Sequence, residues 1–253
     1  MVQGSNSRRD FVRNAALIAG STFAFGSCSG RPPAANDQDG GKPSDEKEKK
    51  SGDEKEVTAA EDLMREHGVL RRVLLVYAET VIRLRRNPNE VSPDALQKTA
   101  NLFRTFGEDY HEKKLEEAYI FPVVKQKGGE AAAISDILIV QHTRGREITD
   151  YILSVTNAAK IGASAGALAE VLNGFIRMYE NHAATEDTII FPAWKESVTD
   201  DQYKELSEKF EDIEHEQFGE DGFEDAVKQI GEIETSVGLA DISQFTAPAP
   251  PAK

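Results

Sequence analysis

Four stretches of apolar residues spaced three and four apart constrain the fold of this chain most, because each carries one histidine. The spacing places the apolar side chains on one face of a helix, so the stretches predict four long helices with a shared interior. The histidines are His67, His111, His142 and His182, four of the five in the chain. The predicted fold class is all-α: an antiparallel up-down-up-down four-helix bundle with an additional C-terminal helical segment.

The expected helix ends follow from proline and glycine. The first helix is predicted to end near Asn87-Pro88, and the second to begin after Ser92-Pro93. Gly128-Gly129 and the stretch 162–166 predict the two later turns. The buried face of the fourth helix is predicted to comprise Leu168, Leu172, Phe175, Tyr179, His182, Glu186, Ile189 and Ala193.

Two matched segments carry the candidate ligands: each runs from a histidine through two acids to Phe-Pro, at 111–122 and at 182–192. In the second segment Glu186 follows His182 by four residues and shares its helix face. In the first segment Glu116 follows His111 by five residues, which turns it away on a regular helix. A local widening such as a π-bulge would restore the common face. Glu112, next to His111, is the alternative ligand.

Imidazole and carboxylate groups repeated at helical spacing are the ligands of an oxygen- and nitrogen-coordinated transition-metal site. A single buried histidine is more often a hydrogen-bonded core residue. Four of them with carboxylates nearby would be costly to bury unless cations compensate them. The pattern therefore favours a metal site. Further candidates are Glu147, which would need a local distortion to reach the metal, and His215, which is flanked by acids.

The N-terminal residues predict export. Ser7-Arg8-Arg9-Asp10-Phe11 resembles the twin-arginine signal, and a short apolar stretch ends in Phe25-Gly26-Ser27-Cys28, which resembles a lipobox. We expect a signal peptide over 1–28 with lipidation at Cys28, or alternatively an exported protein whose cysteine is incidental. The remaining expected divisions are a disordered charged linker at 29–56, the bundle at 57–197, an acidic helical extension at 198–235 and a disordered tail at 236–253.

Charge and cysteine content exclude several classes of protein. The net charge is −14, which argues against a nucleic-acid partner. The single cysteine excludes an internal disulfide and any multi-cysteine zinc or iron–sulfur site.

The histidine order and the sequences Leu63-Met64-Arg65-Glu66-His67 and Tyr110-His111-Glu112-Lys113 resemble the hemerythrin-like, or HHE cation-binding, family over roughly 57–197. The resemblance implies a centre of two iron ions, with manganese or zinc as alternative metals. The implied nitrogen ligands are the four histidines, and the implied bridging carboxylates are Glu116 and Glu186. Oxygen carriers of the family have a second histidine four residues after the one on the third helix, and this chain has Arg146 there.

The resemblance implies a protein that binds or senses dioxygen, nitric oxide or iron at the cell envelope. The alternative is a di-iron enzyme, peroxidase- or catalase-like or nitric-oxide-handling. A ferritin-like site needs two Glu-x-x-His pairs, and only Glu108–His111 supplies one, because Tyr179 precedes His182. We expect a periplasmic or envelope location with membrane contact only through a lipid anchor. The sequence does not fix the redox partner or the oligomeric state.

Overall fold

The computed structural model describes residues 57–156, 161–219 and 222–251. Within these ranges every regular element is a helix and no strand is present, so the all-α prediction is confirmed. The signal sequence, Cys28 and the charged linker lie outside the described residues. No helix in the described part combines the length and low polarity that a membrane span requires.

The first long helix, α2 (Ala59–Arg86), begins where the Thr58 side chain accepts a hydrogen bond from the Glu61 amide and ends before Pro88. A short 3₁₀ helix, η1 (Pro88–Glu90), leads to α3 (Pro93–Leu102), which Ser92 caps with Pro93 in its first turn. Both predicted boundaries are confirmed, since capping residues and proline fix them locally.

From α3 the helix continues without a break through a π-helical segment, η2 (Phe103–Ile120), into α4 (Phe121–Lys127). The widening predicted from the step between His111 and Glu116 is therefore present, and it extends over the whole segment. It ends at Phe121-Pro122, because proline lacks the amide hydrogen that a widened turn would need. Gly128 and Gly129 then turn the chain with φ of 79° and 80°, which other residues rarely adopt.

The third long helix is α5 (Gly129–Thr156), and the fourth runs through α6 (Ile161–Thr185), the π-helical η3 (Glu186–Ile190) and α7 (Phe191–Lys195). The predicted turn at 162–166 was wrong, because α6 already includes it. Each glycine costs a helix only about 1 kcal/mol, and the buried face of α6 outweighs that cost. The prediction that Ile189 is buried was also wrong. Its side chain is 38% exposed and Ile190 is buried instead, since η3 rotates the following residues.

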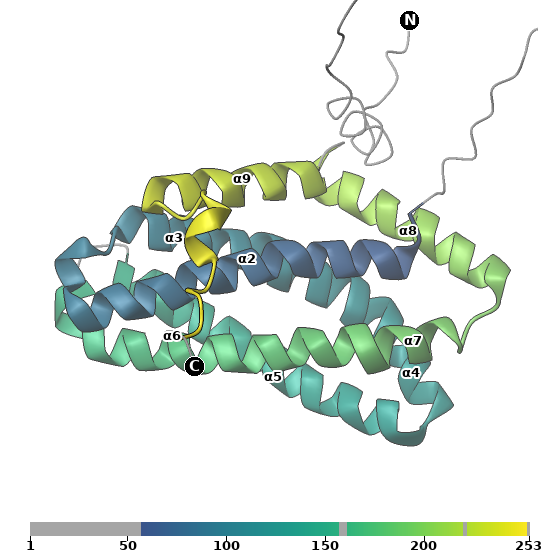
Figure 1. Cartoon of the computed structure of the whole chain (residues 1–253). Helices are drawn as coiled ribbons and strands as arrows, with labels where there is room; N and C mark the ends of the chain where they lie inside the picture. The colour runs from purple at the N-terminus through teal and green to yellow at the C-terminus, as the bar shows by residue number, and fades with distance from the viewer. Residues whose placement is uncertain (1–56, 157–160, 220–221, 252–253) are drawn as a thin grey trace, which may run out of the picture.

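These four lengths of helix pack lengthwise, with α2 along α6 and with α5 against α3, α4 and α6 (Figure 1). Two further helices, α8 (Asp200–Phe218) and α9 (Gly222–Val237), lie along one side and contact α2, α3 and η2. They are separated near Gly219. Phe210 stacks on Trp194 with ring centroids 5.7 Å apart, and Phe218 meets Tyr110 at 5.2 Å. A last 3₁₀ helix, η4 (Ile242–Phe245), lies within the predicted tail.

Candidate metal centre

The four histidines of the predicted site converge in the interior as two pairs. His67 of α2 faces His111 of η2 with their Nε2 atoms 3.1 Å apart, and His142 of α5 faces His182 of α6 at 3.0 Å. All four side chains are at least 97% buried. Residues from four separate helical lengths thus bring four imidazole nitrogens to one point of the core.

Two buried carboxylates lie between the pairs. Glu116 places Oε1 3.2 Å from Nε2 of His111 and Oε2 3.4 Å from Nε2 of His142. Its position depends on η2, because the widened turns bring a residue five positions after His111 onto the same face.

The second carboxylate mirrors the first. Glu186 places Oε2 3.4 Å from Nε2 of His67 and Oε1 3.0 Å from Nε2 of His182. Each glutamate therefore offers one oxygen to each histidine pair. The six side chains therefore form one buried cluster in which the two carboxylates lie between the two histidine pairs.

The outward nitrogen of each histidine is held by a polar side chain of another helix. Nδ1 of His67 lies 2.7 Å from Asp187, and Nδ1 of His111 lies 2.7 Å from Glu66. The other two pairs are Nδ1 of His142 with Glu117 at 2.9 Å and Nδ1 of His182 with Gln141 at 2.8 Å. Carboxylate and amide oxygens only accept hydrogen bonds, so Nδ1 donates its proton and each neutral ring turns its Nε2 lone pair inward.

When all four rings are neutral, the interior consequently contains only lone pairs. None of the four oxygens of Glu116 and Glu186 has a hydrogen-bonding partner within the described part of the chain, although all are buried. Four Nε2 lone pairs face them. An uncompensated buried acceptor costs about 1–3 kcal/mol, more when it is charged. Cations between the two pairs would satisfy the nitrogens and the oxygens together, so the donor set fits a metal.

The electrostatics of the site point the same way. Burial raises the pKa of Glu186, but the His182 and His67 imidazoles outweigh it and hold that pKa below its usual range. Burial lowers the pKa of His142, but Glu112, Glu116 and Glu117 outweigh it and raise that pKa to about 10. The cluster therefore attracts positive charge, whether protons or metal ions, and the two compete.

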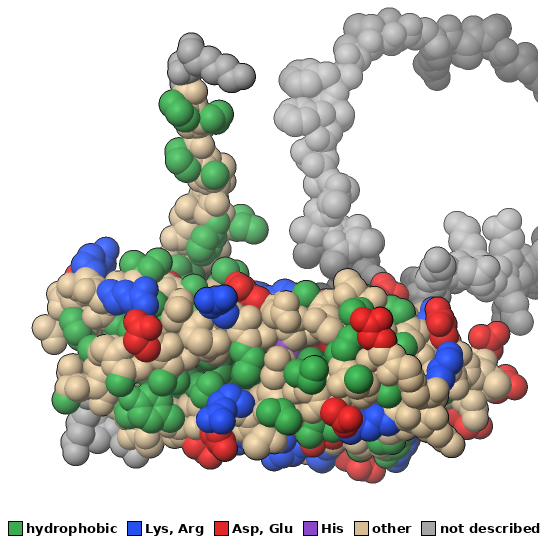
Figure 2. Space-filling model, turned by 90° about the horizontal axis from the view of Figure 1, so that it is seen from below, with side chains coloured by type: hydrophobic (Ala, Val, Ile, Leu, Met, Phe, Trp, Pro, Cys, Tyr) green, Lys and Arg blue, Asp and Glu red, His purple; other side chains and the backbone are tan. Residues whose placement is uncertain are grey.

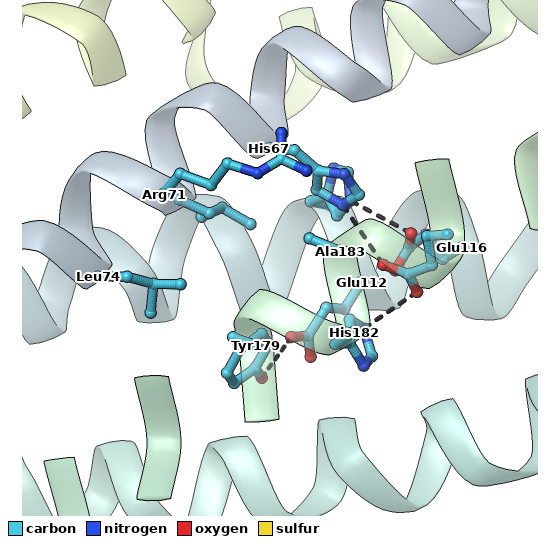
Figure 3. A pocket seen from close by; sticks show the side chains of 11 residues that line it. His67, Arg71, Leu74, Glu112, Glu116, Tyr179, His182 and Ala183 are labelled. Atoms are coloured by element: carbon cyan, nitrogen blue, oxygen red, sulfur yellow. Dashed lines mark hydrogen bonds and ion pairs between the residues drawn. The ribbon is translucent and has the colours of Figure 1, made fainter. Parts of the chain in front are cut away.

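Arg146 lies one helical turn after His142 on α5. Its guanidinium donates to Glu112 Oε2 at 3.1 Å and also contacts Glu117. A third potential ligand group, formed by Glu112, Glu117 and His142, thus already contains a cation of the chain itself. Glu112 also accepts a 2.7 Å hydrogen bond from the buried Tyr179 hydroxyl, so both of its oxygens are engaged (Figure 3).

The structure does not bring the other two candidates to the centre. Glu147 is exposed on a regular stretch of α5 and pairs with Arg144 at 2.9 Å. His215 is exposed on α8. Glu147 could approach the cluster only if α5 were distorted, and α5 is helical throughout its length.

Sequence reasoning missed the outward partners, although a simple signal marks them. Each partner holds a histidine of one helix and stands, in the sequence of another helix, directly beside one of the six residues of the buried cluster. Glu66 precedes His67, Gln141 precedes His142, Glu117 follows Glu116 and Asp187 follows Glu186. A polar residue beside each candidate ligand is therefore the pattern to look for.

Comparison with known proteins identifies the family. The model of the hemerythrin HHE cation binding domain matches residues 58–194, a range that contains the four buried histidines together with Glu116 and Glu186. This chain belongs to the hemerythrin HHE cation-binding family. Its relatives include proteins described as uncharacterized from Mycobacterium bovis and from two strains of Mycobacterium tuberculosis. Each is 42% identical to this chain over 241 residues, covering 94% of this chain and 90% of the relative. No solved structure is a significant match.

Membership of the hemerythrin family supports cation binding, with iron as the metal that the family suggests, and the histidine–glutamate cluster provides the ligands for it. The family match ends before α8 and α9, whereas the similarity to the mycobacterial relatives covers most of the chain.

Proposed function

We propose that this protein binds a pair of iron ions and uses them to bind or sense dioxygen or nitric oxide at the cell envelope. The observation that carries the proposal is the arrangement of Glu116 and Glu186, each with one oxygen toward each histidine pair. One ion would be held by His67 and His111, and the other by His142 and His182. Bound iron supplies open coordination positions and a reversible change of oxidation state.

The proposed frame for this centre is an antiparallel up-down-up-down four-helix bundle formed by α2, the α3–α4 length, α5 and the α6–α7 length. The lengthwise packing of α2 on α6 and of α5 on α4 supports it. In this frame the ligands sit on facing sides of four helices, where the surrounding core holds them rigid.

Arg146 favours sensing or chemistry over reversible oxygen carriage. It replaces a nitrogen ligand by a guanidinium that pairs with Glu112 and Glu117. The second ion would therefore have fewer nitrogen donors than the centre of an oxygen carrier.

The alternative function is a di-iron enzyme that turns over peroxide or nitric oxide. One observation favours it: Glu112 and Tyr179 line the same cavity as the candidate ligands and share a 2.7 Å hydrogen bond. Peroxide chemistry needs a proton donor beside the metal, and the Tyr179 hydroxyl can hold a proton there.

The proposed location follows from the N-terminal signals. We propose export by the twin-arginine route and anchoring through a lipid on Cys28, with 29–56 as the tether. A twin-arginine substrate folds before export, which would let the protein take up iron in the cytoplasm.

Metal analysis tests the proposal. Protein purified after export should contain about two iron ions per chain, and the Glu186→Ala and His182→Ala variants should lose most of them. Glu170→Ala is the matched control, because Glu170 lies on the same helix with its side chain 74% exposed and pairs with Arg85, far from the cluster in sequence. An exported wild-type protein that folds but contains no transition metal would refute the proposal.

A further inference from the structure

We propose that small ligands reach the centre through an opening between α2 and α6, and that Ala183 limits their size to molecules of two or three atoms. Dioxygen, nitric oxide, peroxide and azide belong to this class. The inference rests on the proposed function for the identity of the centre. The opening itself is a feature of the protein and can be tested without metal.

A cavity of about 10 Å³ lies beside the candidate ligands and is lined by side chains of α2, η2, α6 and η3. This volume holds about one water-sized molecule. On one side it touches the imidazoles and carboxylates of the centre. Its apolar lining comes from Leu70 and Leu74 of α2 and from Ala183 of α6, and Arg71 lies beside His67 (Figure 3).

Aromatic side chains close the other approaches to the histidines. At one end Phe191 stacks on His67 and Phe121 on His142, each with ring centroids 5.5 Å apart. Towards the middle of the long helices, Tyr179 packs on His182 at 5.3 Å.

On the side of α8, Phe218 covers Tyr110, whose hydroxyl donates to Glu66 behind His111. The side between α2 and α6 has no large aromatic side chain among the cavity residues apart from Tyr179. A ligand would therefore meet the least obstruction there.

The centre is only just accessible from solvent. His67 and His182 keep 2% and 3% of their surface exposed, whereas Glu116 and Glu186 keep none. Figure 2 shows a face on which a small area of histidine surface lies among hydrophobic side chains. At the rim the Arg71 side chain is 44% exposed and pairs with Asp187, the partner of Nδ1 of His67. This ion pair crosses from α2 to η3 and narrows the opening without adding net charge.

Ala183 determines how large a ligand can pass, because it is the smallest side chain that lines the cavity and any larger residue there would fill the space. It follows His182 directly and is 5% exposed. A leucine there would add three carbons to a space for one water molecule and would fill it. Ala184 is the next residue of the same helix and is exposed, so the same substitution there is the matched control.

The first experiment uses iron-loaded full-length protein and follows azide binding by stopped-flow absorption. Ala183→Leu should slow association on the order of tenfold at unchanged iron content, and Ala184→Leu should leave it unaltered. Leu74→Ala should widen the opening and speed azide association. Wild-type azide kinetics in Ala183→Leu with iron retained would overturn the proposal.

The second experiment needs no metal. In a Cys28→Ser background, Ala183→Cys and Ala184→Cys are compared in chelator-treated protein by mass spectrometry. The thiol introduced by Ala183→Cys should react with a small thiosulfonate, which transfers a methylthio group to sulfur and releases sulfinate. It should react on the order of tenfold more slowly with a bulky aromatic disulfide, whereas the thiol introduced by Ala184→Cys should react with both. A thiol in the Ala183→Cys variant that reacts with neither reagent, or equally fast with both, would overturn the proposal. Folded protein that takes up no iron would refute the proposed function and leave this second test intact.

Discussion

Gly145 and Tyr179 fit together so closely that a β-carbon on Gly145 would lie 2.0 Å from the Tyr179 hydroxyl oxygen. Gly145 lies in the interior of α5, where glycine costs about 1 kcal/mol relative to alanine. In return, the tyrosine from α6 passes α5 and donates its 2.7 Å hydrogen bond to Glu112. Glycine lowers the stability of α5 at this position, but it leaves room for the buried hydrogen bond between Tyr179 and Glu112 beside the candidate centre.

Gly145→Ala should therefore destabilise the protein although alanine is the better helix former. The methyl group would displace the Tyr179 hydroxyl and leave Glu112 Oε1 without that donor. We expect a net loss of about 1–3 kcal/mol in the free energy of unfolding, measured by urea denaturation. Gly174→Ala is the control, because Gly174 lies in α6 with open space around it, and it should gain about 0.5–1 kcal/mol. Equal stabilisation in both variants would refute the role assigned to Gly145.

The main features of the fold followed from the sequence because they depend on local chemistry. Thr58, Ser92 and Pro93 mark helix starts through capping and ring geometry, which act within a few residues. The π-helical segment followed from one spacing, because His111 and Glu116 share a face only on a widened helix. By contrast, η3 was missed: the step of four from His182 to Glu186 needs no widening, and the π turns begin at Glu186 itself.

The features of the site that the sequence did not predict are those that depend on contacts between helices. Gly145 lies on the buried face of α5, but only the register of α6 against α5 shows that Tyr179 needs that space. Similarly, Asp187 reaches His67 across 120 positions of sequence. A pattern within one helix fixes which face is buried, but it does not fix which residue of a neighbouring helix lies opposite.

Glu108 should make the stability of the protein fall as the pH rises. Burial raises the pKa of this carboxyl group to about 7, and Glu112 adds to the increase, while the Thr149 hydrogen bond, Arg104 and Arg146 act against it. Because the folded pKa exceeds the unfolded value of about 4.5, the stabilisation is complete below pH 4.5 and is lost by about pH 7.

Glu108→Gln mimics the protonated form and should remove this pH dependence. At pH 8 the variant should be more stable than the wild type by up to about 3 kcal/mol, less the contribution of the lost pair with Arg104. Unfolding free energies measured from pH 5 to 8 test this, with the exposed Glu170→Gln as the control. A difference that does not change with pH would mean that Glu108 titrates normally.

Asp187→Asn should weaken metal binding without touching a ligand atom. The aspartate accepts from Nδ1 of His67 at 2.7 Å and pairs with Arg71, so it fixes both the orientation and the basicity of that imidazole. Loss of such a partner costs about 10- to 100-fold in metal affinity. Competition with a chromophoric chelator measures the change, and Asp136→Asn, whose side chain is 72% exposed, should bind as the wild type does. Unaltered affinity in Asp187→Asn would show that the hydrogen bond does not position the ring.

Metal removal should destabilise the protein, and the size of the effect should depend on Glu116 and Glu186. Without a metal ion, only protons can compensate their four buried oxygens and the facing Nε2 atoms. Free metal at about 100 times its dissociation constant should raise the free energy of unfolding by about 2.7 kcal/mol, and chelation should abolish the gain. The double variant Glu116→Gln and Glu186→Gln removes the bridging charges and should show little difference between metal-loaded and chelated samples. A chelator that leaves the wild-type unfolding transition unchanged would indicate that the cluster is a protonated polar core and not a metal centre.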